Sequence, residues 1–367
     1  MKRLVMVGLG PVHLHALHAF ARQRVASAQV VWLSSSDKAV MPGQEAACVA
    51  GDVARADISW ELPPIWRAAD VTRCAASVVQ WNTDDRQLRL SDGQVLSYDA
   101  LSLDVSALVD REAIPGARPL GLFTRPPEFF LDMVERLIEL AQERALNVVL
   151  IGSGAAAFEV TLALATRLRH TGSAGSRVAW VTGGGDALEQ FPVPLRERAL
   201  GELKRLGVTV LQVACTSIEP EHVCLDNGAR LACDAPVLAL PAQLPQGLID
   251  SGVLLTDSGT VDTHATFQSR SHPALFVSHT GAGLSAVGPG DTPAHAAQVG
   301  AALAENLRRC IGGGELIPFV APARPGAALS GPGHQALVYS GTPVWGGRLG
   351  GWWKRRADRK AQLSLRG

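Results

Sequence analysis

Residues 4–13, LVMVGLGPVH, decide the fold of the first part of this 367-residue chain, and residues 148–157, VVLIGSGAAA, repeat their design. In each stretch an apolar run ends in a Gly-x-Gly turn, and an apolar-faced helical segment follows. A short run without polar residues is typical of a parallel strand that is buried on both faces. A second strand-like run completes each unit, at residues 30–33 in the first and at residues 177–182 in the second. Both units therefore predict a βαβ crossover.

The glycine turns have the pattern of a dinucleotide site. Gly8 permits a tight turn, and Gly10 lets backbone N–H groups approach a pyrophosphate at the positive end of the next helix. Gly152 and Gly154 repeat this spacing 144 positions later, in the form GxGxxA. Two such units predict two dinucleotide-binding domains, one for a nucleotide that is held tightly and one for a nucleotide that visits.

Both units depart from the full fingerprint. His13 stands where the first unit should have its third glycine, and serines beginning at Ser34 replace the acidic residue that usually binds a ribose. The last strand of the second unit ends at Thr182 and three glycines follow, so the residue that usually separates NADH from NADPH is absent. The sequence assigns neither Arg169 nor Arg177 to a phosphate.

A small antiparallel insertion follows each unit. Residues 78–96 contain two turn signals, and residues 223–234 (VCLDNGARLACD) carry Asn-Gly at a hairpin tip. Pro126-Pro127 marks a linker before an amphipathic helix that extends to about residue 141, and we place a domain boundary there. The chain is therefore predicted to be an α/β protein with an internal repeat.

Composition and cysteine spacing exclude several classes of protein. The chain has 34 Lys+Arg and 34 Asp+Glu, and this zero net charge argues against a general nucleic-acid binder. None of the 6 cysteines forms a CxxC or CxxxxC pair or a zinc-ligand spacing. We therefore expect reduced thiols in a cytoplasmic protein, with no redox disulfide and no metal site. No stretch approaches the roughly 18 apolar residues of a membrane span.

Seven stretches, spread from residue 4 to about residue 360, carry a family resemblance: VGLGPVHLHALHAF, VMPGQEAACVAG, LSDGQVLSYDALSLDVSA, VVLIGSGAAAFEVTLALA, VDTHATFQSRSHPALFV, PAHAAQVGAALAENL and GGWWKRRADR. They resemble FAD/NAD(P)-dependent oxidoreductases with two dinucleotide-binding domains. Within this family the chain is most similar to the branch of type II NADH dehydrogenases and of the FAD-dependent oxidoreductases associated with selenide water dikinase.

The resemblance implies two Rossmann-like three-layer (ββα) domains, with the NAD(P)H domain inserted in the FAD domain. Residues 1–122 and 250–330 would form the FAD-binding domain, and residues 123–249 the NAD(P)H-binding domain. Residues 331–367 would form a basic, Trp-containing C-terminal segment.

The resemblance also implies the cofactor-binding residues. Those for FAD are Gly8, Gly10, Pro11, His13, Ser34, Met41, Pro42, Asp104, Thr280 and Pro293; those for NAD(P)H are Gly152, Gly154 and Ala155. Residue Pro293 would begin a helix whose positive end faces the flavin. The family motif FAxGD reads FVSHT here, so the aspartate that binds the FAD ribityl chain is absent, and Thr280 or His279 would supply a substitute hydrogen bond.

Two residues are candidates for catalysis. Glu159 matches the acid that follows the second fingerprint in type II NADH dehydrogenases, near the nicotinamide; the alternative is an ordinary glutamate that complements the helix dipole. His279 would deliver a proton at the flavin, because histidine titrates near neutral pH; the alternative is a structural histidine.

The main functional hypothesis is an FAD-dependent oxidoreductase. Hydride would pass from NAD(P)H to the flavin, and electrons would leave the flavin directly for a small acceptor, such as a quinone. One alternative is a degenerate, catalytically inactive member that serves as a binding or partner subunit, which the missing acidic residues motivate. Another is a flavoenzyme that is reduced by an organic substrate.

The C-terminal segment is a separate question. Residues 348–366 contain seven Lys or Arg residues and a single acid, Asp358, and Trp352 and Trp353 lie among the cations. Such a segment is typical of a helix on an anionic membrane surface, which predicts a peripheral protein on the inner face of a membrane. Alternatively, the helix packs its tryptophans onto the protein body or onto a partner subunit.

Overall fold

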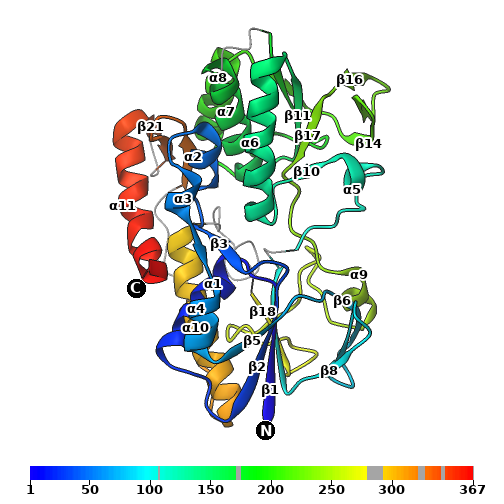
Figure 1. The fold of residues 1–367 in the computed structure, drawn as a ribbon, viewed down its shortest axis with the longest axis vertical. Coiled ribbons are helices and arrows are strands. Elements are labelled where there is room, and N and C mark those ends of the chain that lie inside the picture. The colour runs from blue at the N-terminus through cyan, green and yellow to red at the C-terminus, as the bar shows by residue number, and fades with distance from the viewer. Residues whose placement is uncertain (106–107, 171–174, 279–291, 321–326, 340–343, 367) are drawn as a thin grey trace.

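Two five-stranded parallel sheets form the centre of the molecule, one in its lower and one in its upper half as drawn in Figure 1. The computed structural model describes residues 1–105, 108–170, 175–278, 292–320, 327–339 and 344–366. All pairings within these two sheets are parallel, as the continuous apolar runs of their strands predict.

The first sheet contains the first glycine unit. Its strand order is β18-β9-β1-β2-β5, with β18 at Leu275–Ser278, β9 at Ala100–Asp104, β1 at Lys2–Val7, β2 at Ala28–Leu33 and β5 at Val71–Cys74. Helix α1 (Pro11–Arg22) crosses from β1 to β2, and α10 (Pro293–Gly312) packs against α1. The βαβ crossover predicted at Gly8 is therefore confirmed.

The second sheet repeats this plan. Its order is β10-β17-β11-β12-β13, with β10 at Leu122–Phe123, β17 at Ala235–Leu238, β11 at Asn147–Ile151, β12 at Arg177–Val181 and β13 at Thr209–Leu211. Three helices accompany it: α6 (Pro127–Glu143), α7 (Ala155–His170) and α8 (Val193–Arg205). Helix α7 connects β11 to β12, so the second predicted crossover is also confirmed.

Each parallel sheet is the middle of three layers. Strand β1 turns Leu4 and Met6 toward the core shared with the helices, and Val5 and Val7 toward the antiparallel sheet formed by residues 78–97. This follows from the alternation of side chains along a strand. Strand β11 divides its side chains in the same way, toward helices on one face and toward the antiparallel sheet formed by residues 215–232 on the other.

The two antiparallel sheets lie where hairpins were predicted. The first comprises β6 (Val78–Asn82), β7 (Gln87–Leu90) and β8 (Val95–Ser97); the second comprises β14 (Cys215–Glu219), β15 (His222–Leu225) and β16 (Arg230–Ala232). Strand β14 was not predicted. The tip residue Gly228 has φ +81°, a conformation that glycine adopts at little cost.

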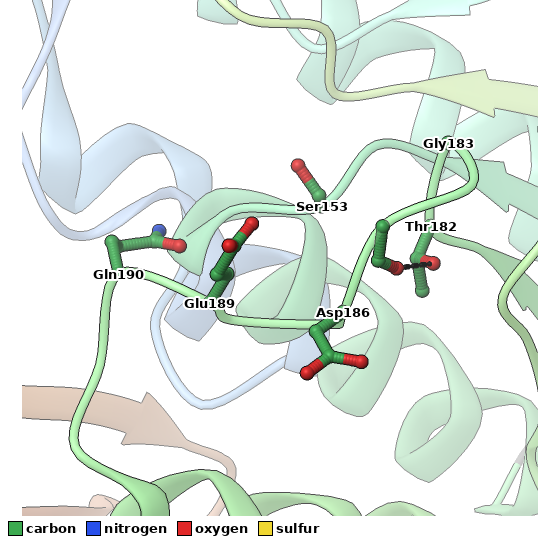
Figure 2. Close-up of a pocket in the computed structure, with 7 residues that line it drawn as sticks. Ser153, Thr182, Gly183, Asp186, Glu189 and Gln190 are labelled. Carbon is green, nitrogen blue, oxygen red and sulfur yellow. Dashed lines mark hydrogen bonds between the residues drawn. The ribbon is translucent and has the colours of Figure 1, made fainter.

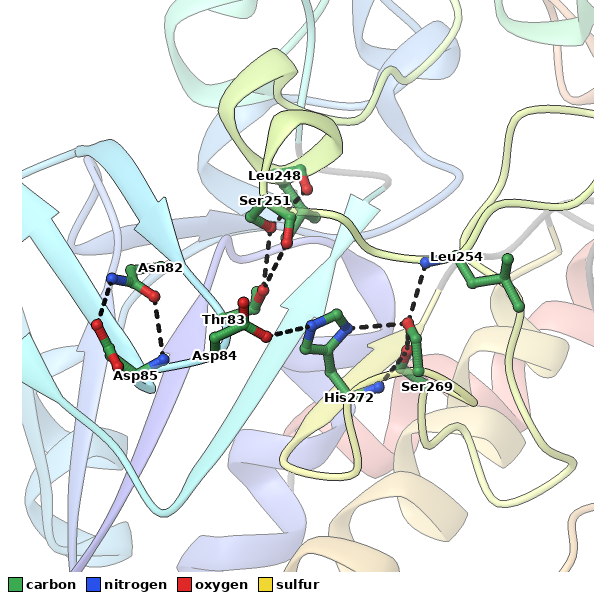
Figure 3. Close-up of polar contacts among 10 residues, drawn as sticks. Asn82, Thr83, Asp84, Asp85, Leu248, Ser251, Leu254, Ser269 and His272 are labelled. Atoms are coloured by element: carbon green, nitrogen blue, oxygen red, sulfur yellow. Dashed lines mark hydrogen bonds and ion pairs between the residues drawn. The ribbon is translucent and has the colours of Figure 1, made fainter.

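The chain leaves the first sheet after β9 and returns to it at β18. Polar contacts fasten the returning segment to the turn between β6 and β7, as Figure 3 shows. The Thr83 hydroxyl donates to the carbonyl of Ser251 at 3.0 Å, and His272 Nε2 lies 3.3 Å from Asp84 Oδ1. In sequence, the strands of the second sheet lie between β9 and β18, which are neighbours in the first sheet.

Shorter elements and a C-terminal unit complete the fold. The shorter elements are β3 (Lys38–Val40), α2 (Glu45–Ala50), α3 (Arg55–Ile58), β4 (Ser59–Glu61), α4 (Pro63–Ala69), α5 (Ala117–Leu120) and α9 (Gln246–Asp250). The C-terminal unit comprises β19 (Ala327–Gly331), β20 (Gln335–Tyr339), β21 (Val344–Gly346) and α11 (Gly347–Arg366). Its strands contact α2, α7 and α8, and α11 packs on β20 (Figure 1).

Candidate functional site

The first glycine turn has the geometry of an anion site. Gly8 has φ +86°, its N–H donates to Leu33 at 3.1 Å, and Gly10 precedes α1 in extended conformation. The backbone N–H groups of Leu9, Gly10 and Val12 have no acceptor among the described residues. Unpaired donors at a helix start attract a negatively charged group, so this turn fits the pyrophosphate of a dinucleotide.

His13 and Asp104 hold this turn from inside the protein. The fully buried His13 ring contacts the carbonyl of Gly8 and the hydroxyl of Ser102, both at 2.9 Å. Burial lowers the pKa of His13, against the opposing charge of Asp104. Asp104 Oδ2 accepts the N–H of His13 at 3.0 Å. In the described structure, therefore, both residues position the turn and α1; direct contact with a cofactor stays a prediction.

The remaining FAD candidates are arranged around this turn and α10. Ser34 is buried, and its hydroxyl donates to the carbonyl of Ser36 at 2.9 Å. Met41 and Pro42 are buried in the turn before α2. A Cβ atom at Gly43 would lie 2.9 Å from Pro293 Cγ, so this turn meets the N-terminus of α10. The structure thus brings together segments about 250 positions apart.

The other two candidates in this region, His279 and Thr280, lie outside the described residues. Their predicted roles, in proton delivery and in replacing the missing aspartate, stay predictions.

The second glycine turn reproduces the first. Gly152 donates its N–H to Val181 at 3.0 Å, and a Cβ atom there would lie 2.3 Å from the carbonyl oxygen of Ala239. Trp180 Nε1 donates to the carbonyl of Gly152 at 2.5 Å, and Trp32 Nε1 donates to that of Gly8 at 2.9 Å. The strand registers of the two tryptophans are equivalent. Sequence analysis missed this pair, although VVWL and VAWV carry the signal.

A polar pocket of about 390 Å³ opens at the carboxyl ends of β11 and β12 (Figure 2). Its lining residues are Ser153, Thr182, Gly183, Gly185, Asp186, Glu189 and Gln190. Residues 154 and 155, the other predicted NAD(P)H-binding positions, follow Ser153 at the start of α7. The strand-end position is the neutral Thr182, and the pocket lining also contains two acids, which lie four and seven positions beyond that threonine.

Glu159, the other catalytic candidate, faces the C-terminal unit. Its Oε1 accepts the N–H of Ser330 in β19 at 2.5 Å. Burial raises the pKa of Glu159, against the opposing charge of Lys354 on α11. Lys354 Nζ in turn lies 2.8 Å from Asp358, and both side chains are largely buried. The described contacts of Glu159 are therefore structural, and a role at the nicotinamide stays a prediction.

Charged contacts also join α2 to the helices of the second sheet. Arg167 on α7 forms two hydrogen bonds with Glu135 on α6, at 2.8 and 2.9 Å, and reaches the carbonyl of Val49 at the end of α2. In the first turn of α6, burial raises the pKa of Glu128 to about 7, and the charge of Glu45 on α2 adds to this effect. The contact region between α2 and the helices of the second sheet thus contains a carboxyl group, that of Glu128, with a raised pKa.

Helix α11 presents a basic and aromatic outer face. Arg356 lies over the ring of Trp352, which is 57% exposed, and Trp353 stacks edge-on with Trp345. Among the positions of this helix whose burial the structure describes, the buried ones are Gly350, Gly351, Asp358 and Leu365. The packing alternative is therefore met by Trp353, which contacts Trp345, and not by the exposed Trp352. Among the described residues, no helix combines the length and the apolar character that crossing a membrane requires.

Comparison with solved structures finds the same fold in several oxidoreductases. The sulfide:quinone oxidoreductase of Aquifex aeolicus aligns over 100% of this chain and 92% of its own, with TM-score 0.71 and 16% identity. NDH2 of Plasmodium falciparum, solved in complex with NADH, aligns over 99% and 96%, with TM-score 0.74 and 10% identity. A ferredoxin reductase from Rhodopseudomonas palustris aligns over 92% and 82%, with TM-score 0.69 and 15% identity. No protein-family model matches the chain.

These likenesses and the two crossovers define the fold class. The chain has the architecture of the two-dinucleotide-binding-domain oxidoreductases, as its sequence predicts. At identities of 10% to 16% the likeness establishes the fold alone, so activity and cofactors have to be argued from this chain's own residues.

Proposed function

We propose that the protein is an FAD-dependent oxidoreductase that accepts hydride from NAD(P)H and passes electrons to a small acceptor, with a quinone as the candidate. The observation that carries this proposal is the pair of glycine turns, each at a βαβ crossover. At the first turn, three N–H groups without described acceptors meet the positive end of α1. NADH-bound NDH2, with the same fold, supports the second nucleotide.

The chain's own residues would bind and orient the two nucleotides. The first turn would hold the FAD pyrophosphate, and the Met41–Gly43 turn and the start of α10 would lie toward the flavin. The second turn and its pocket would hold NAD(P)H. Hydride and electron transfer are the chemistry that the bound flavin supplies. The absence of a CxxxxC pair supports direct transfer from flavin to acceptor.

The visible spectrum of the purified full-length protein tests this proposal. We expect a yellow protein whose flavin absorbance bleaches on anaerobic addition of NADH or NADPH and returns on addition of a soluble quinone. A colourless protein that fails to take up added FAD would contradict the proposal and favour the non-catalytic alternative. A bound flavin that neither nicotinamide reduces would point to reduction by an organic substrate.

The outer face of α11 supports a further proposal, that the protein is cytoplasmic and binds peripherally to the inner face of a membrane. Leu349, Trp352 and Leu363 are exposed on this helix, together with Arg355 and Arg356. A helix with exposed apolar and cationic side chains favours an anionic lipid surface. We expect co-sedimentation with phosphatidylglycerol vesicles but not with phosphatidylcholine vesicles, and loss of binding in a Trp352→Ala/Arg356→Ala variant. If equal amounts of the protein sediment with the two kinds of vesicle, the membrane proposal is refuted.

A further inference from the structure

The second nucleotide pocket contains acidic residues at unusual positions, and we propose that Glu189 and Asp186 make the protein prefer NADH over NADPH. This inference rests on the proposed function, because it takes the pocket as the adenosine end of a nicotinamide dinucleotide site. In βαβ sites of this kind, the ribose 2′-oxygen lies near the carboxyl end of the second strand, where an acid favours NADH and an arginine accommodates the phosphate of NADPH.

The usual discriminating position does not serve that purpose in this chain. It is occupied by Thr182, whose hydroxyl donates to the carbonyl of Gly185 at 2.7 Å. This contact closes the glycine turn that follows β12, and the chain then runs back toward the first turn of α7. There the N–H of Leu188 donates to the carbonyl of Ser153 at 3.0 Å. The fold thus carries the next residue, Glu189, to the pocket edge, and Figure 2 shows its carboxylate turned toward Ser153.

Glu189 is the acid that faces the pocket with an uncompensated charge. Its side chain is exposed and forms no ion pair with any of the described residues. A carboxylate accepts hydrogen bonds from a ribose diol, whereas it repels a phosphate that carries nearly two negative charges. None of the pocket-lining residues named above is basic, so nothing in that lining offsets this repulsion.

Asp186 acts differently, as a positioning residue. Its Oδ2 lies 3.1 Å from a guanidinium nitrogen of Arg196, and its Oδ1 accepts from Gln212 at 3.3 Å. In Figure 2 its carboxylate points away from Ser153. Asp186 therefore pairs with Arg196, and a guanidinium that is already paired is less able to receive a phosphate. Removing Asp186 would both subtract a negative charge and release a positive one.

Anaerobic calorimetric titration of the full-length protein with NADH and with NADPH tests the inference, after the flavin has been reduced with dithionite so that neither nucleotide can transfer hydride to it. We expect NADH to bind about tenfold tighter at low ionic strength, and the ratio to shrink as salt is added. Glu189→Gln should tighten NADPH binding about fivefold and not tighten NADH binding. Asp186→Asn should tighten NADPH binding more, and an added Arg196→Ala should abolish that gain. Glu139→Gln, an exposed acid on α6 outside the pocket lining, is the matched control.

The outcomes separate this inference from the proposed function. Equal or tighter binding of NADPH by the unaltered protein would overturn the inference and leave the oxidoreductase proposal standing. An unchanged NADH-to-NADPH ratio in Glu189→Gln, with native far-UV circular dichroism, would do the same. If neither nucleotide binds, the proposed function fails, and the inference fails with it.

Discussion

Replacing Trp180 with Phe tests how the second glycine turn is held in place. Trp180 is fully buried, and its indole N–H donates to the carbonyl of Gly152 at 2.5 Å. Leaving a buried carbonyl without its donor costs about 1–3 kcal/mol. The smaller ring leaves a cavity that adds about 1–2 kcal/mol. We therefore expect Trp180→Phe to lower the free energy of unfolding by about 2–5 kcal/mol.

Trp66 provides the matched control, because it separates the hydrogen bond from the cavity. Its side chain is also buried, but its Nε1 has no hydrogen-bond acceptor among the described residues. Trp66→Phe should therefore cost the cavity contribution, about 1–2 kcal/mol, and part of the cation–π contact with Arg73, without the cost of an unpaired carbonyl. Trp32→Phe should resemble Trp180→Phe, because Trp32 donates to the carbonyl of Gly8.

The assay is unfolding in guanidinium, monitored by far-UV circular dichroism. This signal depends less on the replaced tryptophan than fluorescence does. The expected difference between Trp180→Phe and Trp66→Phe is about 1–3 kcal/mol. If the two variants lose equal stability, the indole hydrogen bond does not stabilise the turn, and the reasoning is refuted.

Three further predictions concern the same unfolding free energy. Gly152→Ala places a Cβ atom 2.3 Å from a carbonyl oxygen and should lower the free energy of unfolding by about 3 kcal/mol. Gly183→Ala places its Cβ atom in open space and should lower it by about 1 kcal/mol. Equal losses in the two variants would contradict the steric overlap at Gly152. Burial raises the pKa of Glu128 to about 7, so the folded state favours the protonated form and loses stability as pH rises from 4.5 to 7. The free energy of unfolding of Glu128→Gln, relative to that of the unaltered protein, should therefore be up to about 3 kcal/mol higher at pH 8 than at pH 4. A difference between the two proteins that does not change with pH would refute this. Burial lowers the pKa of His18 to about 4, so stability should fall as pH drops from 6.5 to 4, and His18→Gln should reduce that slope; an unchanged slope would count against it.

The sequence by itself determined the two crossovers and their layers. The runs at residues 4–7 and 148–151 are apolar throughout, which is typical of strands buried on both faces, and Gly-x-Gly follows each run directly. These signals span a few adjacent residues, and local backbone preference decides their outcome. Asn227-Gly228 predicted its hairpin tip for the same reason.

Only the tertiary structure decided which side chains meet at the candidate site. Glu159 contacts Ser330, 171 positions away, and His13 contacts Ser102, 89 positions away. Glu189 reaches the pocket at the carboxyl ends of β11 and β12 because Thr182 closes one turn and the N–H of Leu188 donates to the carbonyl of Ser153. None of these pairings follows from spacing or periodicity. They depend on how the strands order themselves and on which loops then share one sheet edge, because a contact between distant residues forms only when the packed core brings their backbones together.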